Sequence, residues 1–146
     1  MIHRHGIPVE EVRTQIANVI RGNGPLLEQF HELFYRQSFT WGMTRYRGHP
    51  VLKNPCDLWI YQEVLHDTQP TLLVETGTAC GGSAWYFADV LAHHGGRVLT
   101  IDVEPTAMPP HPGVTYLTGG STDPAVLARV AHAGKYTWAL KATMLP

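Results

Sequence analysis

The amino-acid sequence predicts an α/β fold, in which a Rossmann-like parallel sheet with flanking helices follows an N-terminal helical extension. An apolar run at residues 72–74 ends in the carboxylate of Glu75, and a glycine-rich turn and a helical pattern from about Ser83 follow it. A second apolar run, residues 98–101, ends in another carboxylate, Asp102. Strands separated by a crossover helix form right-handed, parallel βαβ units. We expect the sheet to be truncated after about three or four strands.

The first part of the chain is predicted to be mostly helical. Apolar residues between positions 9 and 20 recur at helical spacing, and the Gly-Asn-Gly sequence at 22–24 interrupts that helix. A second helix is expected to begin at Pro25, because proline suits the first helical turn. Residues 40–55 are rich in glycine, proline and aromatic side chains and are expected to be irregular.

The second part of the chain alternates strands and helices. Asp57 is expected to cap a third helix that ends before Pro70. The elements expected after it are strands at 72–76, 97–102 and 114–118, helices at 83–93 and 124–132, and a short fourth strand at 136–140. We therefore divide the chain into an extension, residues 1–56, and the N-terminal half of a cofactor-binding Rossmann-like domain, residues 57–146. If the 136–140 segment fails to pair, the first strand exposes an apolar edge, which favours homo-oligomers.

Composition narrows the class of protein. The 146 residues are 44% hydrophobic and 16% charged, with a net charge of −1, which is typical of a globular domain. The basic residues are scattered, so we expect no nucleic-acid partner. No apolar run is long enough to cross a bilayer and the N-terminus lacks an apolar signal core, so we expect no membrane span and a cytoplasmic protein. The two cysteines, Cys56 and Cys80, have no metal-ligand spacing.

The glycine-rich turn predicts a nucleotide-type ligand. A dinucleotide fingerprint has glycine at the first, third and sixth positions of this turn, but here the positions hold Gly77, Ala79 and Gly82. Glu75 adds a negative charge that repels a diphosphate and attracts a cation. The pattern favours S-adenosylmethionine over a nicotinamide dinucleotide, because S-adenosylmethionine has a sulfonium and an ammonium group but no phosphate.

Polar residues after the second and third strands are candidates for the nucleoside part of the ligand. Asp102 can accept hydrogen bonds from ribose hydroxyls, although it could also be a solvated residue at the end of a strand. Ser121 and Asp123 lie where an adenine edge is expected, yet both could instead cap the helix that begins at Pro124. Capping is the favoured role for Asp123, and both roles stay open for Ser121.

The most specific signals in the sequence are four short motifs. They are Thr40-Trp41-Gly42, the stretch Lys53–Glu63, Glu75-Thr76-Gly77 together with Gly81–Ala84, and Thr100–Val103. Over roughly residues 40–130 the chain resembles the cephalosporin hydroxylase family. That family also includes rhamnosyl O-methyltransferases and is similar to class I S-adenosylmethionine-dependent methyltransferases.

The resemblance implies which residues bind the cofactor. Asp102 is expected to bind the ribose, and the turn that ends in Ser121 is expected to lie near the adenine. The methionine end of the cofactor is expected to contact Glu75, Gly77, Gly81 and Ser83. With Thr76 included, the implied cofactor-binding set is Glu75, Thr76, Gly77, Gly81, Ser83, Asp102 and Ser121. No catalytic residue is identified.

The resemblance also implies a magnesium site on an acidic motif after the fourth strand. No Asp or Glu follows Asp123 in this chain, and a hard divalent cation needs oxygen ligands. We therefore expect the magnesium site to be absent and the chain to be an incomplete, inactive form of the enzyme.

The predicted function is that of an S-adenosylmethionine-dependent O-methyltransferase that acts on a hydroxyl group of a sugar or natural product, a small-molecule substrate. Three alternatives stay open: a non-catalytic truncated remnant, an NAD-dependent oxidoreductase, and a hydroxylase of a β-lactam nucleus. The hydroxylase would need an iron-binding triad of two histidines and a carboxylate, which the spacing does not offer.

Overall fold

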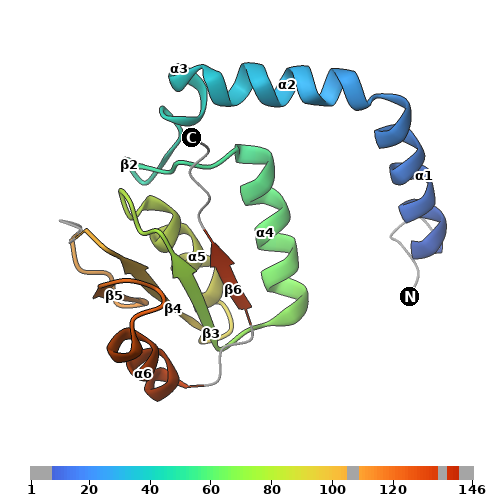
Figure 1. Cartoon of the computed structure of the whole chain (residues 1–146). Helices are drawn as coiled ribbons and strands as arrows, with labels where there is room; N and C mark the ends of the chain where they lie inside the picture. The colour runs from blue at the N-terminus through green and yellow to red at the C-terminus, as the bar shows by residue number, and fades with distance from the viewer. Residues whose placement is uncertain (1–7, 105–108, 135–137, 142–146) are drawn as a thin grey trace. The chain divides into compact units, whose positions relative to one another are not determined.

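The structure is a computed structural model that describes residues 8–104, 109–134 and 138–141 of the chain. The chain consists of two compact units that divide between Thr40 and Trp41 (Figure 1). The sequence placed a boundary later, between residues 56 and 57. The difference arises because a hairpin within residues 45–50 contacts a helix of the second unit.

The first unit is helical, as predicted. Helix α1 spans Val9–Gly22 and helix α2 spans Gly24–Arg36, with Asn23 between them. The Asn23 amide donates a 2.8 Å hydrogen bond to the Val19 carbonyl and ends α1. Helix α2 has no buried side chain, and Phe30 is about half exposed. A four-residue helix, α3 (Ser38–Trp41), follows.

The segment predicted to be irregular contains a hairpin. Strands β1 (Arg45–Tyr46) and β2 (His49–Pro50) pair antiparallel through a two-residue turn. Both turn residues, Arg47 and Gly48, have positive φ angles of 49° and 85°. This is the geometry of a type I′ turn, which matches the twist of the strands it joins.

Helix α4 spans Pro55–Thr68 and ends before Pro70, as expected, but its cap was assigned wrongly. The capping residue is Asn54, whose side chain accepts a 2.9 Å hydrogen bond from the Cys56 N–H group. Asp57, the predicted cap, lies inside the first helical turn. Pro55 explains the earlier start, because its fixed φ angle suits the first helical position and leaves Asn54 outside the helix.

The sheet is parallel and four-stranded. Its strands are β3 (Leu72–Thr76), β4 (Arg97–Asp102), β5 (Val114–Thr118) and β6 (Trp138–Lys141), in the order β5-β4-β3-β6. The α/β fold class and the first three strands are therefore confirmed. The fourth strand is described from Trp138 to Lys141, and the first two residues of the expected strand, 136–137, lie outside the described part. Strand β3 pairs with β4 on one side and with β6 on the other, so its apolar edge is not exposed, and this reason for oligomerisation is removed.

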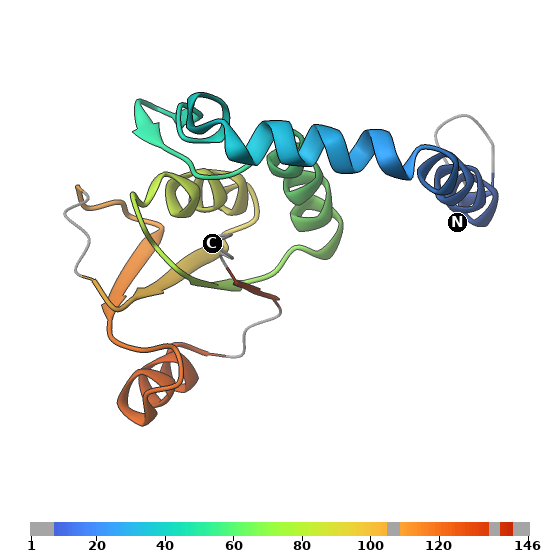
Figure 2. The same cartoon turned by 45° about the horizontal axis from the view of Figure 1, so that its top comes forward.

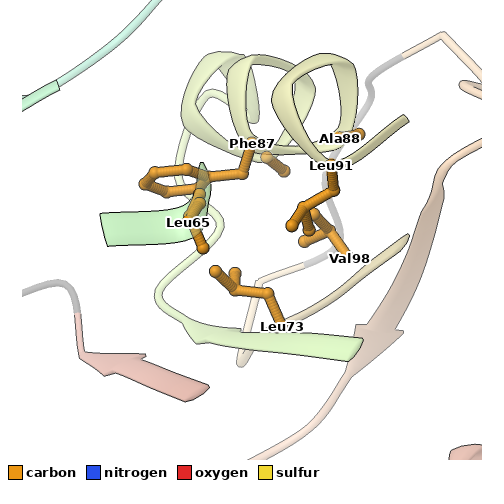
Figure 3. Close-up of a cluster of buried hydrophobic side chains, with 7 residues drawn as sticks. Leu65, Leu73, Phe87, Ala88, Leu91 and Val98 are labelled. Carbon is orange, nitrogen blue, oxygen red and sulfur yellow. The ribbon is translucent and has the colours of Figure 1, made fainter. Parts of the chain in front are cut away.

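Apolar side chains cover both faces of the sheet. Helix α5 (Gly82–Ala92) lies with α4 on one face, where Leu73 and Val98 pack against Phe87 and Leu65 (Figure 3). Helix α6 (Pro124–Ala133) lies on the other face, as Figure 2 shows, and contributes Val126 to a second cluster. A continuous run of buried residues in β3 is expected for a strand covered on both sides. Within the described residues, no helix combines the length and apolar character that crossing a bilayer requires.

Candidate functional site

The glycine-rich turn links the carboxyl end of β3 to α5. Gly77 and Gly81 have φ angles of 88° and 73°, which glycine adopts without strain. Ala79, at the position of the missing fingerprint glycine, has a φ angle of 44°, which is costly for a residue with a Cβ atom. The Gly77 N–H group donates a 2.8 Å hydrogen bond to the Ile101 carbonyl of β4, which holds the turn at the end of the sheet.

Asp102, at the end of β4, stabilises the strained turn. Its Oδ2 atom accepts a 2.8 Å hydrogen bond from the Ala79 N–H group, and its Oδ1 atom accepts one of 3.2 Å from Glu104. Burial acts to raise the pKa of Asp102, but backbone N–H groups, that of Ala79 foremost, outweigh it and hold the pKa below its ordinary value. The carboxylate is therefore ionised at neutral pH. It is partly exposed and can accept further hydrogen bonds, because each oxygen has two lone pairs.

Glu75 lies beneath the turn and is fully buried, with 0% exposure. Its Oε1 atom accepts a 2.7 Å hydrogen bond from the Ser83 hydroxyl, and its Oε2 atom accepts one of 3.0 Å from Thr100. Burial raises the pKa of Glu75, while the Ser83 hydrogen bond and the charge of Lys53 oppose that shift. The sequence suggested a carboxylate that faces the ligand. The structure gives Glu75 internal partners instead, so its charge reaches a bound molecule only through space.

A chain of buried hydroxyls joins Glu75 to the turn. Thr78, which is 3% exposed, lies 2.8 Å from Thr100 through their Oγ1 atoms. Because the Thr100 proton is donated to Glu75, Thr78 donates to Thr100. One network therefore connects β3, β4, α5 and the glycine turn, and in the described part every buried side-chain polar atom has a partner.

Lys53, which precedes α4, is a site residue that the sequence did not reveal. Its Nζ atom lies 4.0 Å from the Glu75 Oε1 atom, and its side chain is only 15% exposed. Twenty-two positions separate the two residues in the chain, and no local spacing rule connects them. The only available signal was that Lys53 belongs to one of the four motifs singled out above.

Gly82, treated in the sequence as one more glycine of the turn, has a separate role. A Cβ atom at this position would lie 2.3 Å from the Pro50 carbonyl oxygen and 2.9 Å from that of His49. The hairpin backbone therefore rests directly on the first turn of α5, where only glycine fits.

The remaining predicted residues lie near the same edge of the sheet. Thr76 ends β3 and pairs in register with Ile101. Ser121 is exposed in the turn after β5, and that turn is anchored by a 2.7 Å hydrogen bond from the Gly119 N–H group to the Asp102 carbonyl. Asp123 accepts a 2.8 Å hydrogen bond from Ala125 and caps α6, which confirms its favoured role.

The described residues contain no cluster of metal ligands. Within these ranges, no three His, Cys, Asp or Glu side chains lie close enough to hold a metal ion.

A hollow of about 580 Å³ lies between α6 and the sheet and is lined by residues such as Leu99, Leu117 and Arg129. No residue of the glycine turn lines this hollow, so it is separate from the edge where the predicted residues gather.

The sequence model of the rhamnosyl O-methyltransferase/CmcI family matches residues 38–140. The chain belongs to this family. The match extends the resemblance inferred from the motifs by two residues at the start and ten at the end, and it includes the hairpin, the turn, strands β3 to β5 and all of β6 except Lys141. The family predicted from the sequence is thus confirmed.

Curated proteins that are similar to this chain support the family assignment. A rhamnosyl O-methyltransferase of Mycobacterium bovis is 36% identical over 116 residues, which are 75% of this chain and 47% of that protein. The Mycobacterium leprae protein is 32% identical over 117 residues, 77% of this chain and 51% of its own length. The chain thus spans about half the length of the curated relatives it matches.

Solved CmcI structures share the fold. An SAH form has a TM-score of 0.59 at 21% identity and matches 72% of this chain and 55% of its own. The apo-structure has a TM-score of 0.60 at 22% identity, with coverage of 71% and 47%. A form with Mg and SAM has a TM-score of 0.58 at 22% identity.

Proposed function

We propose that this member of the family binds S-adenosylmethionine at the carboxyl edge of β3 and β4. The observation that carries the proposal is the ionised Asp102, which is held beside the turn by two backbone N–H groups and has lone pairs left for ribose hydroxyls. Parallel α/β sheets bind ligands at this edge. The names of the related proteins, together with SAM and SAH in the solved relatives, agree with this choice of ligand.

The described residues fit this cofactor. The turn lacks the close-approach glycine that a pyrophosphate requires, because Ala79 occupies its position. Asp102 would hold the ribose, and the exposed Ser121 after β5 would lie near the adenine. Glu75, under the turn, would contribute a negative charge near the cationic sulfur, and Gly77, Thr76, Gly81 and Ser83 would shape the turn around the amino-acid part.

We propose O-methylation of a sugar or natural-product hydroxyl as the reaction of the complete site. The bound cofactor supplies an electrophilic methyl group. The residues of this chain would align the cofactor and exclude water, which can account for a large part of such a rate enhancement. Magnesium is not part of the proposal for the described residues, because they bring no three carboxylate, imidazole or thiolate groups together.

Cofactor binding is tested by calorimetric titration of the 146-residue chain with S-adenosylhomocysteine and, separately, with NAD. We expect S-adenosylhomocysteine to bind more tightly. A preference for NAD would instead support an oxidoreductase.

Methyl transfer is tested separately, with labelled S-adenosylmethionine and a panel of sugar and phenol acceptors. We expect no turnover by this chain, with or without magnesium, because its described residues include neither a metal site nor an assigned base. Measurable transfer would show that the described residues suffice for catalysis.

A further inference from the structure

Lys53 has an ammonium group without a hydrogen-bond acceptor in the described part of the chain. Its nearest anionic atom is Oε1 of Glu75, at 4.0 Å, which is beyond hydrogen-bonding distance. The side chain is 15% exposed, so bulk water reaches it only in part. An ammonium group has three donors, and no fully buried side-chain polar atom of the described residues lacks a partner, so water still reaches the Lys53 Nζ atom. The ammonium group can therefore donate to a ligand acceptor that displaces this water.

Glu75 does not occupy these donors. Its oxygens accept hydrogen bonds of 2.7 Å from Ser83 and 3.0 Å from Thr100, whereas the Lys53 Nζ atom lies 4.0 Å from Oε1, too far to donate one. The attraction between Lys53 and Glu75 is therefore Coulombic and leaves the donors of the ammonium group available. A ligand oxygen that carries negative charge would satisfy them best, since charge-assisted hydrogen bonds are the strong ones.

The position of Lys53 indicates which part of a ligand it would meet. Lys53 and Ser83 approach the same oxygen of Glu75, so the ammonium group lies beside the first turn of α5. Asp102 lies at the end of the adjacent strand β4. The site thus combines a hydroxyl acceptor next to β4 with a cation next to α5. It matches a molecule that has ribose hydroxyls at one end and an anionic group at the other.

The backbone around this point is consistent with an anion. The N–H groups of Gly82, Ser83 and Ala84 donate no hydrogen bond within the described residues, and no side chain caps α5. The amino end of a helix carries partial positive charge, which adds to the charge of Lys53.

We propose that Lys53 binds the α-carboxylate of the amino-acid part of S-adenosylmethionine, a role that rests on the proposed function. Glu75 keeps Lys53 in place through its charge, and Ser83 orients Glu75. Lys53 is then the residue that distinguishes the complete cofactor from nucleosides that lack the carboxylate.

The test compares two ligands that differ only in that carboxylate, S-adenosylhomocysteine and its decarboxylated analogue. Calorimetric titration of the wild-type chain should show tighter binding of S-adenosylhomocysteine. Lys53→Met should weaken its binding at least about tenfold, the effect of losing one charge-assisted hydrogen bond, and leave the affinity for the decarboxylated analogue nearly unchanged. Lys53→Arg should restore most of the difference.

Two further variants control the result. Arg13→Met removes the same charge from an exposed position on α1 and should leave both affinities unchanged. Lys53→Met combined with Glu75→Gln removes the unpaired carboxylate, so the chain can fold even if the single variant cannot, and it should show the same loss of ligand discrimination.

The outcomes separate the two proposals. If the wild-type chain binds neither ligand, the proposed function and this inference both fail. If the wild-type chain binds both ligands and the Lys53 variants weaken both by the same factor, only the inference fails, and Lys53 merely neutralises Glu75.

Discussion

Replacing Gly82 by alanine should destabilise the sheet unit, although the same change usually stabilises a helix. Alanine gains about 0.5–1 kcal/mol over glycine inside a helix. Here the added Cβ atom would lie 2.3 Å from the Pro50 carbonyl oxygen, a backbone atom that cannot rotate away. Forcing extra atoms into a packed place costs about 1–3 kcal/mol, and a contact this short to a backbone atom belongs at the upper end of that range, so the net free energy of unfolding should fall by about 2 kcal/mol.

The matched control is Gly120→Ala in the same unit. A Cβ atom at Gly120 meets nothing within 4 Å, and its φ angle lies outside the left-handed region. Its free energy of unfolding should change by less than about 0.5 kcal/mol. Urea denaturation followed by far-UV circular dichroism measures both variants. If Gly82→Ala is as stable as the wild type or more so, the hairpin does not rest on α5 as described.

Three further predictions concern the site and the core. Asp102→Ala should weaken the binding of S-adenosylhomocysteine by about 1.5–3 kcal/mol, measured by calorimetry. An unchanged affinity in a folded variant would mean that Asp102 stabilises the turn but does not bind the ligand. Lys53→Met should raise the pKa of Glu75 further. A carboxyl group whose folded pKa is raised loses stability progressively as pH rises from its ordinary pKa through the raised one, so the variant should lose more stability at pH 8 than at pH 5 in urea titrations. A pH-independent loss would contradict the coupling. Phe87→Ala should lower the free energy of unfolding by about 3–5 kcal/mol, because this side chain is fully buried. Leu127→Ala should lower it far less, because Leu127 is half exposed. Equal losses of stability in thermal melts would refute the assignment of the core.

The strands and helices that the sequence predicted correctly are those with local signals. Strand β3 is a short apolar run, and α6 begins at an Asp-Pro pair and ends before Gly134, so both could be located within a residue or two. The hairpin was missed because each of its strands has only two residues, which is too short for an alternating pattern. The cap of α4 was displaced because Asn54 and Asp57 are equally good capping residues, and the local signal that favours Asn54 is Pro55, which suits the first helical position.

The site was predicted in part for the same reason. Asp102 lies beside the glycine turn, as expected, because parallel strands bring their carboxyl ends to one edge of the sheet. Its role in cofactor binding stays a prediction. The burial of Glu75 could not be read from its neighbours in the chain, because Thr100 and Lys53, which surround it, come from other elements. A charge that is exposed in an isolated strand–turn–helix becomes an internal one only after the sheet and the segment before α4 have assembled.

The hydrogen bonds that fix Ala79 in its left-handed conformation also have a kinetic consequence. The bonds of Asp102 and the buried threonines lie within the protein, so we expect a cofactor to meet a turn that is already ordered. A preformed site spares the ligand the entropy cost of ordering a loop. Association should then follow a single phase whose rate rises in proportion to ligand concentration, and the heat-capacity change of binding should be no larger than the buried apolar surface of the cofactor requires.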